Sequence, residues 1–403
     1  MPSTLPDGEP VPADGALPAT ALGQVGARGF GIYVHVPFCA SRCGYCDFNT
    51  YTAVELGGGA TQTEYAQTVL SEVALAARVL AGTAPRIDTV FFGGGTPTLL
   101  PPDDLARILD GLDGAFGLAG DVEVTTEANP ESVDPDRLRR LRRSGFTRIS
   151  LGMQSAAGHV LALLDRRHTP GRAVAAAAEA SEAGFDHVNL DLIYATPGET
   201  AEDFAASLDL AVAAGVDHVS AYSLIVEDGT RLAARVRRGE VPEPDDDVAA
   251  DRYLAAEARL SAAGLSWYEV SNWARPGAAC RHNLLYWRGG DWWGFGPGAH
   301  SHVGGVRWWN VKHPSAYAGR LAAGQTPAHA RERLGPEERA TEALMLGLRL
   351  AEGLALRDLP GPADRLVQDG LLDPDAHGAG RAVLTLRGRL LADAVIVQLL
   401  TAT

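Results

Sequence analysis

The sequence predicts an α/β protein built on a parallel β-sheet, either a β/α barrel or an open doubly wound sheet. From Gly31 onward, short β-branched or aromatic runs alternate with Ala- and Leu-rich helical stretches. Several of these stretches end on a glycine followed by an apolar residue, as expected where a left-handed cap turns the chain back onto a sheet. Repeated strand–helix units pair in parallel through right-handed crossovers, so the chemistry should lie at the carboxyl ends of the strands.

The expected elements follow one another along the chain. Strands are predicted at 32–38, 87–92, 122–127, 147–152, 187–194, 217–224 and 266–270. Helices are predicted between them at 63–80, 134–143, 171–183, 201–214 and 247–263. The capping glycines are Gly145, Gly184, Gly215 and Gly264. After about Gly335 the expected order is helix, helix, strand and helix, at 337–350, 362–369, 382–386 and 388–400. That order suggests a small winged-helix-like α+β module.

The chain is therefore expected to have three parts. Residues 1–28, rich in Pro, Ala and Gly, would be a disordered lead-in. Residues 29–310 would form the main domain, with an aromatic segment at 268–310, and 311–403 the linker and C-terminal module. Because residues 331–403 hold 9 basic and 11 acidic side chains, packing or partner contact is favoured for this module over reading DNA.

Composition limits the function further. The 403 residues and 46% hydrophobic content suffice for one large domain plus a smaller one. Lys+Arg 35 against Asp+Glu 50 gives a net charge of −15, which argues against non-specific nucleic-acid binding. No run resembles a membrane span, and the N-terminus lacks the charged start and apolar centre of a secretory signal. Three of the four cysteines fall within eight residues, which indicates a site in a reducing cytoplasm more than a disulfide framework.

The main chemical feature is the loop Cys39-Ala-Ser-Arg-Cys43-Gly-Tyr-Cys46, which follows an apolar strand. A C-x-x-x-C-x-x-C loop can hold three irons of a [4Fe–4S] cube and leave the fourth without a protein ligand. That iron can be chelated by the amino and carboxylate groups of S-adenosylmethionine. The alternatives are incidental thiols or structural zinc, which needs four ligands and would have to recruit His35 or the distant Cys280.

A glycine-rich turn and polar strand ends surround this loop in the predicted fold. Gly93-Gly94-Gly95-Thr96-Pro97 follows a strand, and the missing side chains would let the backbone approach a ligand closely. Glu127, Gln154 and Asp191 stand at the ends of later strands, and in a parallel barrel such residues point into one cavity. Each alone could be a solvated loop residue. The three together favour a shared site.

Several motifs are specific enough to indicate a family. They are Tyr33-Val-His-Val-Pro-Phe-Cys39, the turn at 93–97, Glu127-Ala-Asn-Pro130 and Asn189-Leu-Asp-Leu-Ile-Tyr194. They resemble the radical SAM branch around oxygen-independent coproporphyrinogen III oxidase and, more closely, its relatives, the HemW heme chaperones. The resemblance runs from about residue 30 to the end. It implies a partial (β/α)6 radical SAM barrel, a [4Fe–4S] cluster on Cys39, Cys43 and Cys46, and the C-terminal module of this branch.

The resemblance also implies a set of residues around S-adenosylmethionine. They are Tyr33, Tyr45, Gly94, Gly95, Thr96, Glu127, Gln154, Arg166 and Asp191. The two tyrosines would lie beside the cluster, the glycine-rich turn would meet the methionyl end, and the other polar side chains would hold further groups of the cofactor. Arg166 lies in a helical stretch and could instead be a surface charge. Whether one or two cofactor molecules bind is left open.

Two features separate the subgroups of this branch. The oxidases continue the cysteine loop as C-x-x-x-C-x-x-C-x-C and carry a longer N-terminal segment, whereas here Cys46 is followed by Asp47 and Phe48. No catalytic residue is therefore assigned, and coproporphyrinogen oxidation is not the favoured activity. The second feature is His282-Asn283-Leu-Leu-Tyr286-Trp287, which is similar to the H-N-x-x-Y-W motif of the HemW group.

A heme site is expected near this second motif. Five of the seven tryptophans fall between Trp287 and Trp309, and heme needs a flat apolar slot with an axial ligand, most often His. The residues expected at the site are His282, Asn283, Tyr286 and Trp287. His282 is the first candidate ligand, and its rivals are Cys280, His300 and His302. Composition alone would favour aromatic packing that seals the barrel, with His282 as a hydrogen-bonded core residue.

The resemblance implies a heme chaperone, which binds heme and passes it to apo-hemoproteins such as respiratory hemoproteins at the membrane. The cluster and S-adenosylmethionine would regulate or stabilise it, for instance through a homodimer, instead of driving turnover. The alternative is an oxygen-independent coproporphyrinogen III oxidase, in which a 5′-deoxyadenosyl radical abstracts hydrogen from a propionate side chain with loss of CO2. A remoter alternative is a radical enzyme with another small substrate. We expect a cytoplasmic protein without nucleic-acid partners, with at most peripheral contact to the inner membrane face.

Overall fold

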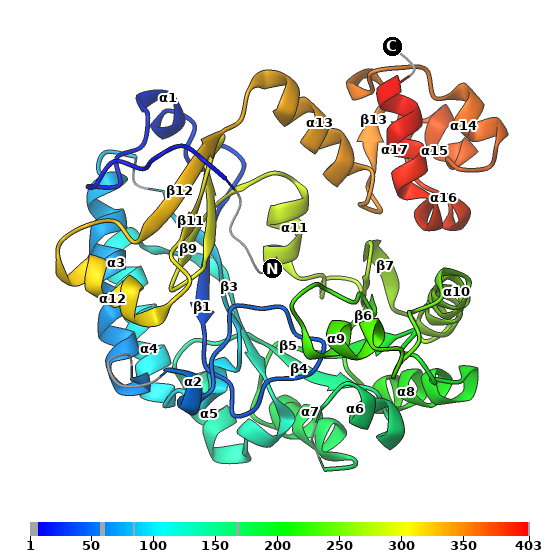
Figure 1. The fold of residues 1–403 in the computed structure, drawn as a ribbon. Coiled ribbons are helices and arrows are strands. Elements are labelled where there is room, and N and C mark those ends of the chain that lie inside the picture. Colours follow the sequence, from blue (N-terminus) through cyan, green and yellow to red (C-terminus); the bar gives the residue numbers. More distant parts are fainter. Residues whose placement is uncertain (1–6, 57–60, 84, 167–168, 402–403) are drawn as a thin grey trace.

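The computed structural model describes residues 7–56, 61–83, 85–166 and 169–401. A twelve-stranded sheet in the order β12-β11-β10-β9-β1-β2-β3-β4-β5-β6-β8-β7 forms its centre (Figure 1). The strands are β1 (Phe30–Val36), β2 (Ile87–Gly94), β3 (Leu118–Ala128), β4 (Arg148–Gln154), β5 (His187–Tyr194), β6 (His218–Ser223), β7 (Ser266–Glu269), β8 (Asn272–Ala274), β9 (Asp291–Phe295), β10 (His300–Val303), β11 (Val306–Asn310) and β12 (Ala328–Arg333). The helices of this main body are α1 (Ala19–Leu22), α2 (Ala53–Leu56), α3 (Gln62–Val79), α4 (Pro102–Phe116), α5 (Pro135–Arg143), α6 (Gly158–Leu163), α7 (Arg172–Glu182), α8 (Ala201–Ala213), α9 (Arg231–Arg237), α10 (Asp246–Ala262), α11 (Arg281–Trp287) and α12 (Pro314–Ala322).

The pairing of the parallel strands decides between the two predicted architectures. β1 to β6 pair in the order of the chain. With right-handed crossovers, consecutive pairing places the connecting helices on one face of a curved sheet, as in a barrel, instead of on both faces. β1 continues sideways into β9, and β6 into β8, so the barrel stays open. The predicted α/β class with a central parallel sheet is confirmed.

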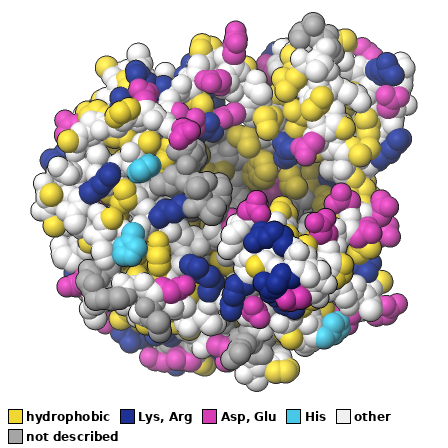
Figure 2. Space-filling model, in the orientation of Figure 1, with side chains coloured by type: hydrophobic (Ala, Val, Ile, Leu, Met, Phe, Trp, Pro, Cys, Tyr) yellow, Lys and Arg dark blue, Asp and Glu magenta, His cyan; other side chains and the backbone are white. Residues whose placement is uncertain are grey.

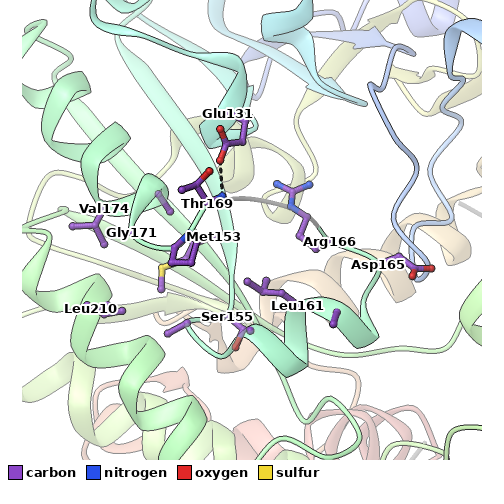
Figure 3. Close-up of a pocket in the computed structure, with 15 residues that line it drawn as sticks. Glu131, Met153, Ser155, Leu161, Asp165, Arg166, Thr169, Gly171, Val174 and Leu210 are labelled. Carbon is purple, nitrogen blue, oxygen red and sulfur yellow. Dashed lines mark hydrogen bonds between the residues drawn. The ribbon is translucent and has the colours of Figure 1, made fainter.

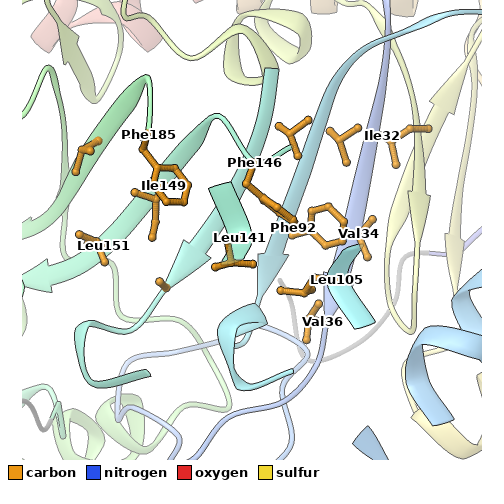
Figure 4. Close-up of a cluster of buried hydrophobic side chains, with 14 of the residues drawn as sticks. Ile32, Val34, Val36, Phe92, Leu105, Leu141, Phe146, Ile149, Leu151 and Phe185 are labelled. Atoms are coloured by element: carbon orange, nitrogen blue, oxygen red, sulfur yellow. The ribbon is translucent and has the colours of Figure 1, made fainter. Parts of the chain in front are cut away.

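The main hydrophobic core lies on the outer face of this sheet (Figure 4). Val34, Phe92, Leu105 and Phe146 are fully buried there, and the rings of Phe92 and Phe146 are 5.2 Å apart. Burial of such a side chain contributes about 1.5–3 kcal/mol. Because successive side chains of a strand point to opposite faces, the neighbours of these residues point into the barrel. The outer face therefore supplies stability, and the inner face is left for polar groups.

The strand predicted at 266–270 exists as β7 but does not join the parallel series. β6 pairs antiparallel with β8, and β8 pairs antiparallel with β7. Only residues 270–271 connect β7 to β8. A parallel connection needs a crossover of a dozen or more residues, whereas two residues suffice for a hairpin.

The domain boundary expected at 311 lies too early. α12 packs against α3, and β12 pairs with β11 at the edge of the main sheet. The aromatic segment at 268–310 forms regular structure within the main body. It contains β8, α11 and β9–β11, and β9 lies parallel to β1. Residues 311–333 therefore complete the main body.

The described part of the N-terminal segment, residues 7–28, is packed, contrary to the expected disorder. Glu9 exchanges backbone hydrogen bonds with Arg331 of β12, and its carboxylate contacts Arg333. Ala21 of α1 is buried. A Pro- and Gly-rich segment cannot build a core of its own, but here the edge of an existing sheet offers it partners. Residues 1–6 of the predicted lead-in lie outside the described residues.

The C-terminal module has its own hydrophobic core, which includes Leu348, Leu372 and Val395. Its elements are α13 (Pro336–Gly347), β13 (Leu354–Ala355), α14 (Asp364–Gln368), α15 (Pro374–Gly378), β14 (Arg381–Ala382), α16 (Leu386–Leu390) and α17 (Ala392–Thr401). The single helix predicted at 388–400 is two helices that meet at Leu391. The strand predicted at 382–386 is shorter than expected, because the Thr385 side chain already caps α16.

Candidate functional site

The cysteine loop is fastened at the carboxyl end of β1. The Cys39 amide donates to the Tyr51 carbonyl, at 3.0 Å, which closes the loop on itself. Beneath the loop, the His35 ring bonds the Asn49 carbonyl through Nε2, at 2.8 Å, and the Tyr33 hydroxyl through Nδ1, at 3.0 Å. The Asn49 side-chain amide in turn donates to the Pro297 carbonyl, after β9, and to the Lys312 carbonyl, after β11. Buried polar groups thus hold the loop in one conformation.

The three cysteines of the loop form no disulfide and are half-buried, and they lie close enough for the charge of one thiolate to affect its neighbours. Burial raises the pKa of Cys39 to about 11, and the neighbouring Cys46 raises it further. Burial also raises the pKa of Cys46, against a hydrogen bond to the Phe48 backbone. The Arg166 guanidinium lies 3.6 Å from the Cys43 sulfur. Thiols that stay protonated in the free protein lose their protons when they ligate a metal.

This donor set fits an iron–sulfur cube better than a single zinc ion. Within the described ranges, no group of three or more His, Cys, Asp or Glu side chains is arranged to hold one metal ion. Structural zinc needs four ligands around one point. Cys280, a possible fourth ligand by sequence, is buried against Glu123 near the amino-terminal end of the barrel. A cube instead takes separate thiolates at its corners, and three of them leave one iron for an exchangeable ligand.

Two carboxylates, one on β3 and one on β5, lie near the cysteine loop. Burial raises the pKa of Glu127 to about 8, and the charge of Asp191 adds to the rise. The Gly94 amide donates to Glu127 Oε2, at 3.0 Å. Burial also raises the pKa of Asp191, which accepts from Ser150 Oγ at 2.9 Å and from Asn189 Nδ2 at 2.7 Å. Adjacent buried carboxylates attract a cationic ligand, and S-adenosylmethionine carries an ammonium and a sulfonium group.

Arg166 belongs to this group and is not a surface charge. Its Nη2 donates to the Gly152 carbonyl, at 3.0 Å, and its charge also reaches Tyr45 and Asp191. Gln154 lies two residues further along β4 and has a φ of 64°. Left-handed backbone is unfavourable for a residue with a side chain and persists where the surroundings enforce it, often at functional sites.

The glycine-rich turn packs against the cysteine loop. The amides of Gly95 and Thr96 donate to the carbonyls of Val36 and Phe38, at 2.8 and 2.7 Å. A Cβ atom at Gly95 would lie 2.4 Å from the Phe38 carbonyl oxygen. The amides of this turn, including that of Gly94, are therefore already used within the protein. The expected contact of Gly94, Gly95 and Thr96 with a methionyl group would have to use their other backbone atoms.

The motif at 282–287 forms α11, which closes the amino-terminal end of the barrel. The His282 ring bonds the Thr89 hydroxyl through Nδ1 and the Tyr286 hydroxyl through Nε2, both at 2.8 Å. Its backbone amide donates to Glu123, at 3.0 Å. A Cβ atom at Gly31 of β1 would lie 2.4 Å from the Leu285 side chain, so the missing side chain there admits the helix. Both ring nitrogens of His282 thus have partners.

A row of aromatic rings connects α11 with the cofactor end of the barrel. His282 stacks on Phe91 with ring centroids 5.2 Å apart, and Phe91 stacks on Tyr33 at 6.3 Å. On the other side of His282, Tyr286 packs edge-on against it at 4.7 Å and against Trp292 at 4.6 Å. Tyr33 also lies close enough to Glu127 for the carboxylate charge to raise the Tyr33 pKa, after burial. The barrel interior is thus lined by rings between the two motifs.

A cavity of about 880 Å³ opens beside the end of β4 (Figure 3). Its lining is mostly apolar and includes Met153, Leu161, Val174 and Leu210. Of the residues expected to bind S-adenosylmethionine, Arg166 alone lines it. The cavity therefore adjoins the polar group described above and does not contain it.

Several residues that hold this site were not predicted. Asn189 lies two positions before Asp191 on β5, so strand alternation could have placed both side chains on the inner face. His35 could have been placed beside Tyr33 in the same way. His218 and Tyr268 had no comparable signal, because they come from later strands and meet the site only in the folded chain.

The chain is similar to several known proteins. Residues 33–211 match the family model of the radical SAM superfamily. Heme chaperone HemW of Mycobacterium tuberculosis (strain ATCC 25618 / H37Rv) is 57% identical over 384 residues, which are 94% of this chain and 97% of that protein. Heme chaperone HemW of Bacillus subtilis (strain 168) is 31% identical over 373 residues, which are 90% of this chain and 97% of that protein.

A solved structure shares the fold over nearly the whole chain. Coproporphyrinogen III oxidase (HemN) from Escherichia coli, described as a radical SAM enzyme, superposes with a TM-score of 0.79. The match covers 95% of this chain and 92% of that chain, at 24% sequence identity. At this identity the similarity concerns the fold, and it includes the C-terminal module.

Proposed function

Because the chain belongs to the HemW heme chaperone family and carries a radical SAM domain over residues 33–211, we propose that it binds heme and delivers it to apo-hemoproteins. One [4Fe–4S] cluster on Cys39, Cys43 and Cys46 and S-adenosylmethionine beside it are the implied resident cofactors. When bound, the cluster supplies a redox centre with one open iron. In this proposal the two cofactors support or regulate heme handling and are not consumed in it.

The row of rings from Tyr33 to Trp292 is the observation that carries this proposal. Heme is a flat apolar plate, and stacked or edge-on rings offer surfaces of matching shape. The four proposed heme-contacting residues are His282, Asn283, Tyr286 and Trp287. Figure 2 shows that the molecular surface is hollowed beside the C-terminal module and that apolar side chains gather in the hollow. This hollow supports the approach of a large apolar ligand from that face.

The candidate axial ligands differ in the interactions that each would lose on binding the heme iron. His282 would have to give up one of two buried hydrogen bonds, at roughly 1–3 kcal/mol. Burial raises the pKa of the Cys280 thiol, which disfavours the thiolate. His302 bonds the Gly290 carbonyl through Nδ1, at 3.0 Å, and together with Trp287 lines a cavity of about 230 Å³ next to α13. That volume is below the roughly 300–1,000 Å³ of a site for a drug-sized ligand, so it would take only an edge of the macrocycle.

The test is an anaerobic titration of cluster-reconstituted protein with hemin, followed by the Soret band. We expect saturation at one heme per chain and loss of specific uptake in either His282→Ala or His302→Ala, whichever removes the ligand. His159→Ala, an exposed histidine on α6, is the matched control. Absence of specific uptake in the unchanged protein would overturn the heme proposal and make His282 a packing residue.

One observation keeps coproporphyrinogen III oxidation as a second candidate. Three polar side chains lie near the cysteine loop: Glu127, Arg166 and Asp191. Passive binding of heme would not require them. The residues after Cys46 are Asp47 and Phe48, where the oxidases have a further cysteine, and this departure disfavours the oxidase. Formation of 5′-deoxyadenosine that depends on coproporphyrinogen III would establish the second candidate against the first.

We also propose a cytoplasmic location, hemoprotein acceptors such as those of respiration, and a homodimer as the assembly that the cofactors would stabilise. No helix in the described ranges is long and apolar enough to cross a bilayer. Any membrane contact would then be peripheral or through an acceptor. Sedimentation with lipid vesicles, and light scattering with and without S-adenosylmethionine, would test contact and assembly separately.

A further inference from the structure

A chain of hydrogen bonds runs through the barrel interior from α11 to Asp191. Asn283 Nδ2 lies 3.3 Å from the Tyr268 hydroxyl, which lies 2.8 Å from His218 Nε2. His218 Nδ1 lies 2.6 Å from Asn189 Oδ1. Asn189 Nδ2 lies 2.7 Å from Asp191 Oδ1. The five side chains come from α11, β7, β6 and β5, so the chain crosses one side of the barrel from its closed end to the cofactor level.

The donor and acceptor groups of these side chains fix one donor-to-acceptor direction for the whole chain of hydrogen bonds. An ionised carboxylate only accepts, so the amide nitrogen of Asn189 faces Asp191 and its oxygen faces His218. His218 must then donate from Nδ1, and a neutral imidazole with its proton on Nδ1 accepts at Nε2. Tyr268 therefore donates to His218, and its oxygen is left to accept from Asn283. All four donors point toward Asp191.

The surroundings preserve this direction. His218 is 2% exposed and Asn189 is 4% exposed, so water does not compete for their hydrogen bonds. Burial lowers the pKa of His218 well below its usual value, and the nearby Arg148 lowers it further, so the imidazole stays neutral. In a low-dielectric interior, successive hydrogen bonds polarise one another and each is stronger than in water. Asn189 Nδ2 also lies 2.6 Å from Ser150 Oγ and 3.0 Å from Ser220 Oγ, so the chain of hydrogen bonds orients an amide that has three acceptors, one of which is Asp191 Oδ1.

We infer that Asn283, Tyr268 and His218 are positioning residues for Asp191, which they hold in the orientation that binds S-adenosylmethionine. The inference rests on the proposed cofactor site and adds to it a role for part of the α11 motif. His282 and Asn283 are neighbours on α11 but join separate networks, because His282 bonds Thr89 and Tyr286. Asn283 thus lies at the closed end of the barrel and helps to orient Asp191 at the cofactor end.

Removal of the Tyr268 hydroxyl breaks the chain at its centre. In Tyr268→Phe the Nε2 atom of His218 is left buried without a donor, so the imidazole and the Asn189 amide can turn away from the orientation that serves Asp191. Loss of one such partly buried hydrogen bond is expected to weaken binding by about tenfold. Tyr253→Phe is the control, because Tyr253 is a buried tyrosine, whereas Tyr268 is half-buried, and the Tyr253 hydroxyl lies 3.4 Å from Arg389, outside the chain of hydrogen bonds.

The experiment is calorimetric titration of anaerobic, cluster-reconstituted protein with S-adenosylmethionine in the absence of heme. We expect Kd to rise about tenfold in Tyr268→Phe and to change less than twofold in Tyr253→Phe. His218→Leu should act like Tyr268→Phe, while His218→Gln, which can still donate and accept, should recover part of the affinity. Iron content and melting temperature, measured on every variant, separate lost binding from lost folding. If Tyr268→Phe does not fold, Asn283→Ala removes the first donor and should raise Kd about threefold.

The outcomes distinguish the inference from the function on which it rests. Equal affinities in Tyr268→Phe, Tyr253→Phe and the unchanged protein would overturn the positioning role and leave the cofactor site intact. Failure of the unchanged, cluster-loaded protein to bind S-adenosylmethionine would overturn both. Recovery in His218→Gln but not in His218→Leu would tie the effect to the direction of the hydrogen bonds, which a packing role alone would not produce.

Discussion

The two ends of the barrel interior use the same types of residue in opposite ways. At the amino-terminal end, Arg148 and Glu123 are paired at 3.1 Å with side chains 2% and 5% exposed. Arg148 also donates to the Ala278 carbonyl, and Glu123 accepts from the amide of His282. At the carboxyl end, burial raises the pKa of both Glu127 and Asp191, and the charge of Asp191 adds to the rise for Glu127.

The difference shows what each end is built to do. The opposite charges of Arg148 and Glu123 compensate each other and hold α11 in the barrel, and of the Arg148 nitrogens only Nη1 is buried without a hydrogen-bond partner. A carboxylate such as Glu127, whose pKa is raised by burial and by the charge of Asp191, destabilises the empty protein and is stabilised when a cationic ligand binds. This division agrees with the general rule that the carboxyl ends of barrel strands carry function and the amino-terminal ends carry stability.

The largest expected effect concerns the cysteine loop. Cys43→Ala should abolish the iron–sulfur absorbance, because a cube would keep only two protein thiolates. Iron content and the visible spectrum after anaerobic reconstitution measure it. Cys280→Ala, at the opposite end of the barrel, should keep full iron content. Full cluster occupancy in Cys43→Ala would contradict the assigned ligands and remove the basis of the comparison between the two ends.

The next effect is on stability. Arg148→Met should lower the free energy of unfolding by about 3–5 kcal/mol, because Glu123 is left buried without its partner. Urea unfolding of the reconstituted protein measures it. Arg142→Met, which breaks an exposed pair with Asp186, should cost no more than about 1 kcal/mol. Similar losses of unfolding free energy in the two variants would show that the buried ion pair contributes no more to stability than an exposed pair.

The third expected effect is a gain in stability instead of a loss. The pKa of Glu127 is about 8 in the folded protein, above the value of about 4.3 expected when unfolded. The empty protein therefore loses stability as the pH rises from about 4.3 to 8. Glu127→Gln removes this loss, so the variant should be no more stable near pH 4 but more stable by roughly 2–4 kcal/mol above pH 8.

Urea unfolding at pH 5, 7 and 9 without S-adenosylmethionine measures this third effect, and the variant should bind the cofactor more weakly. The exposed Glu202 provides a control, since Glu202→Gln should shift stability equally at each pH. If the difference in unfolding free energy between Glu127→Gln and the unchanged protein does not grow with pH, the buried Glu127 carboxylate does not destabilise the empty protein.

The smallest expected effect is at the closed end. Thr89→Val keeps the side-chain shape but leaves Nδ1 of His282 without its partner, so stability should fall by about 1 kcal/mol. Chemical unfolding measures the change, with the exposed Thr63→Val as the control. Affinity for S-adenosylmethionine should not change, because Thr89 lies outside the hydrogen-bond chain to Asp191. A loss of that affinity would show that the two ends are less separate than proposed.

Much of the carboxyl end could be predicted from the sequence. The cysteine spacing is local, and Glu127 and Asp191 follow from their place at the ends of apolar runs, where a parallel sheet collects side chains. The role of the glycine-rich turn was only partly predicted. Its glycines could be taken for a ligand cradle, whereas Gly95 also needs its missing side chain to pass the Phe38 carbonyl.

The amino-terminal end could not be predicted in the same way. Arg148 meets Glu123 and Ala278 only after the barrel has formed, and 130 residues separate Arg148 from Ala278 in sequence. The packed N-terminal segment and the β7–β8 hairpin were missed for a related reason. The composition of the N-terminal segment is typical of loops, whereas β7 was predicted as a strand and only its antiparallel pairing with β8 was missed. The sheet edges that order both segments lie far away in the chain.

By itself, the sequence determined the series of strand–helix units, the cysteine loop and the family, because alternation, glycine caps and motif spacing are properties of neighbouring residues. The tertiary structure decided which end of the barrel is closed and what the residues of α11 contact. His282 reaches Thr89 across 193 positions and Glu123 across 159. Asn283 reaches Asp191 only through three intermediate side chains. Such contacts depend on how the sheet curves, and no local pattern encodes them.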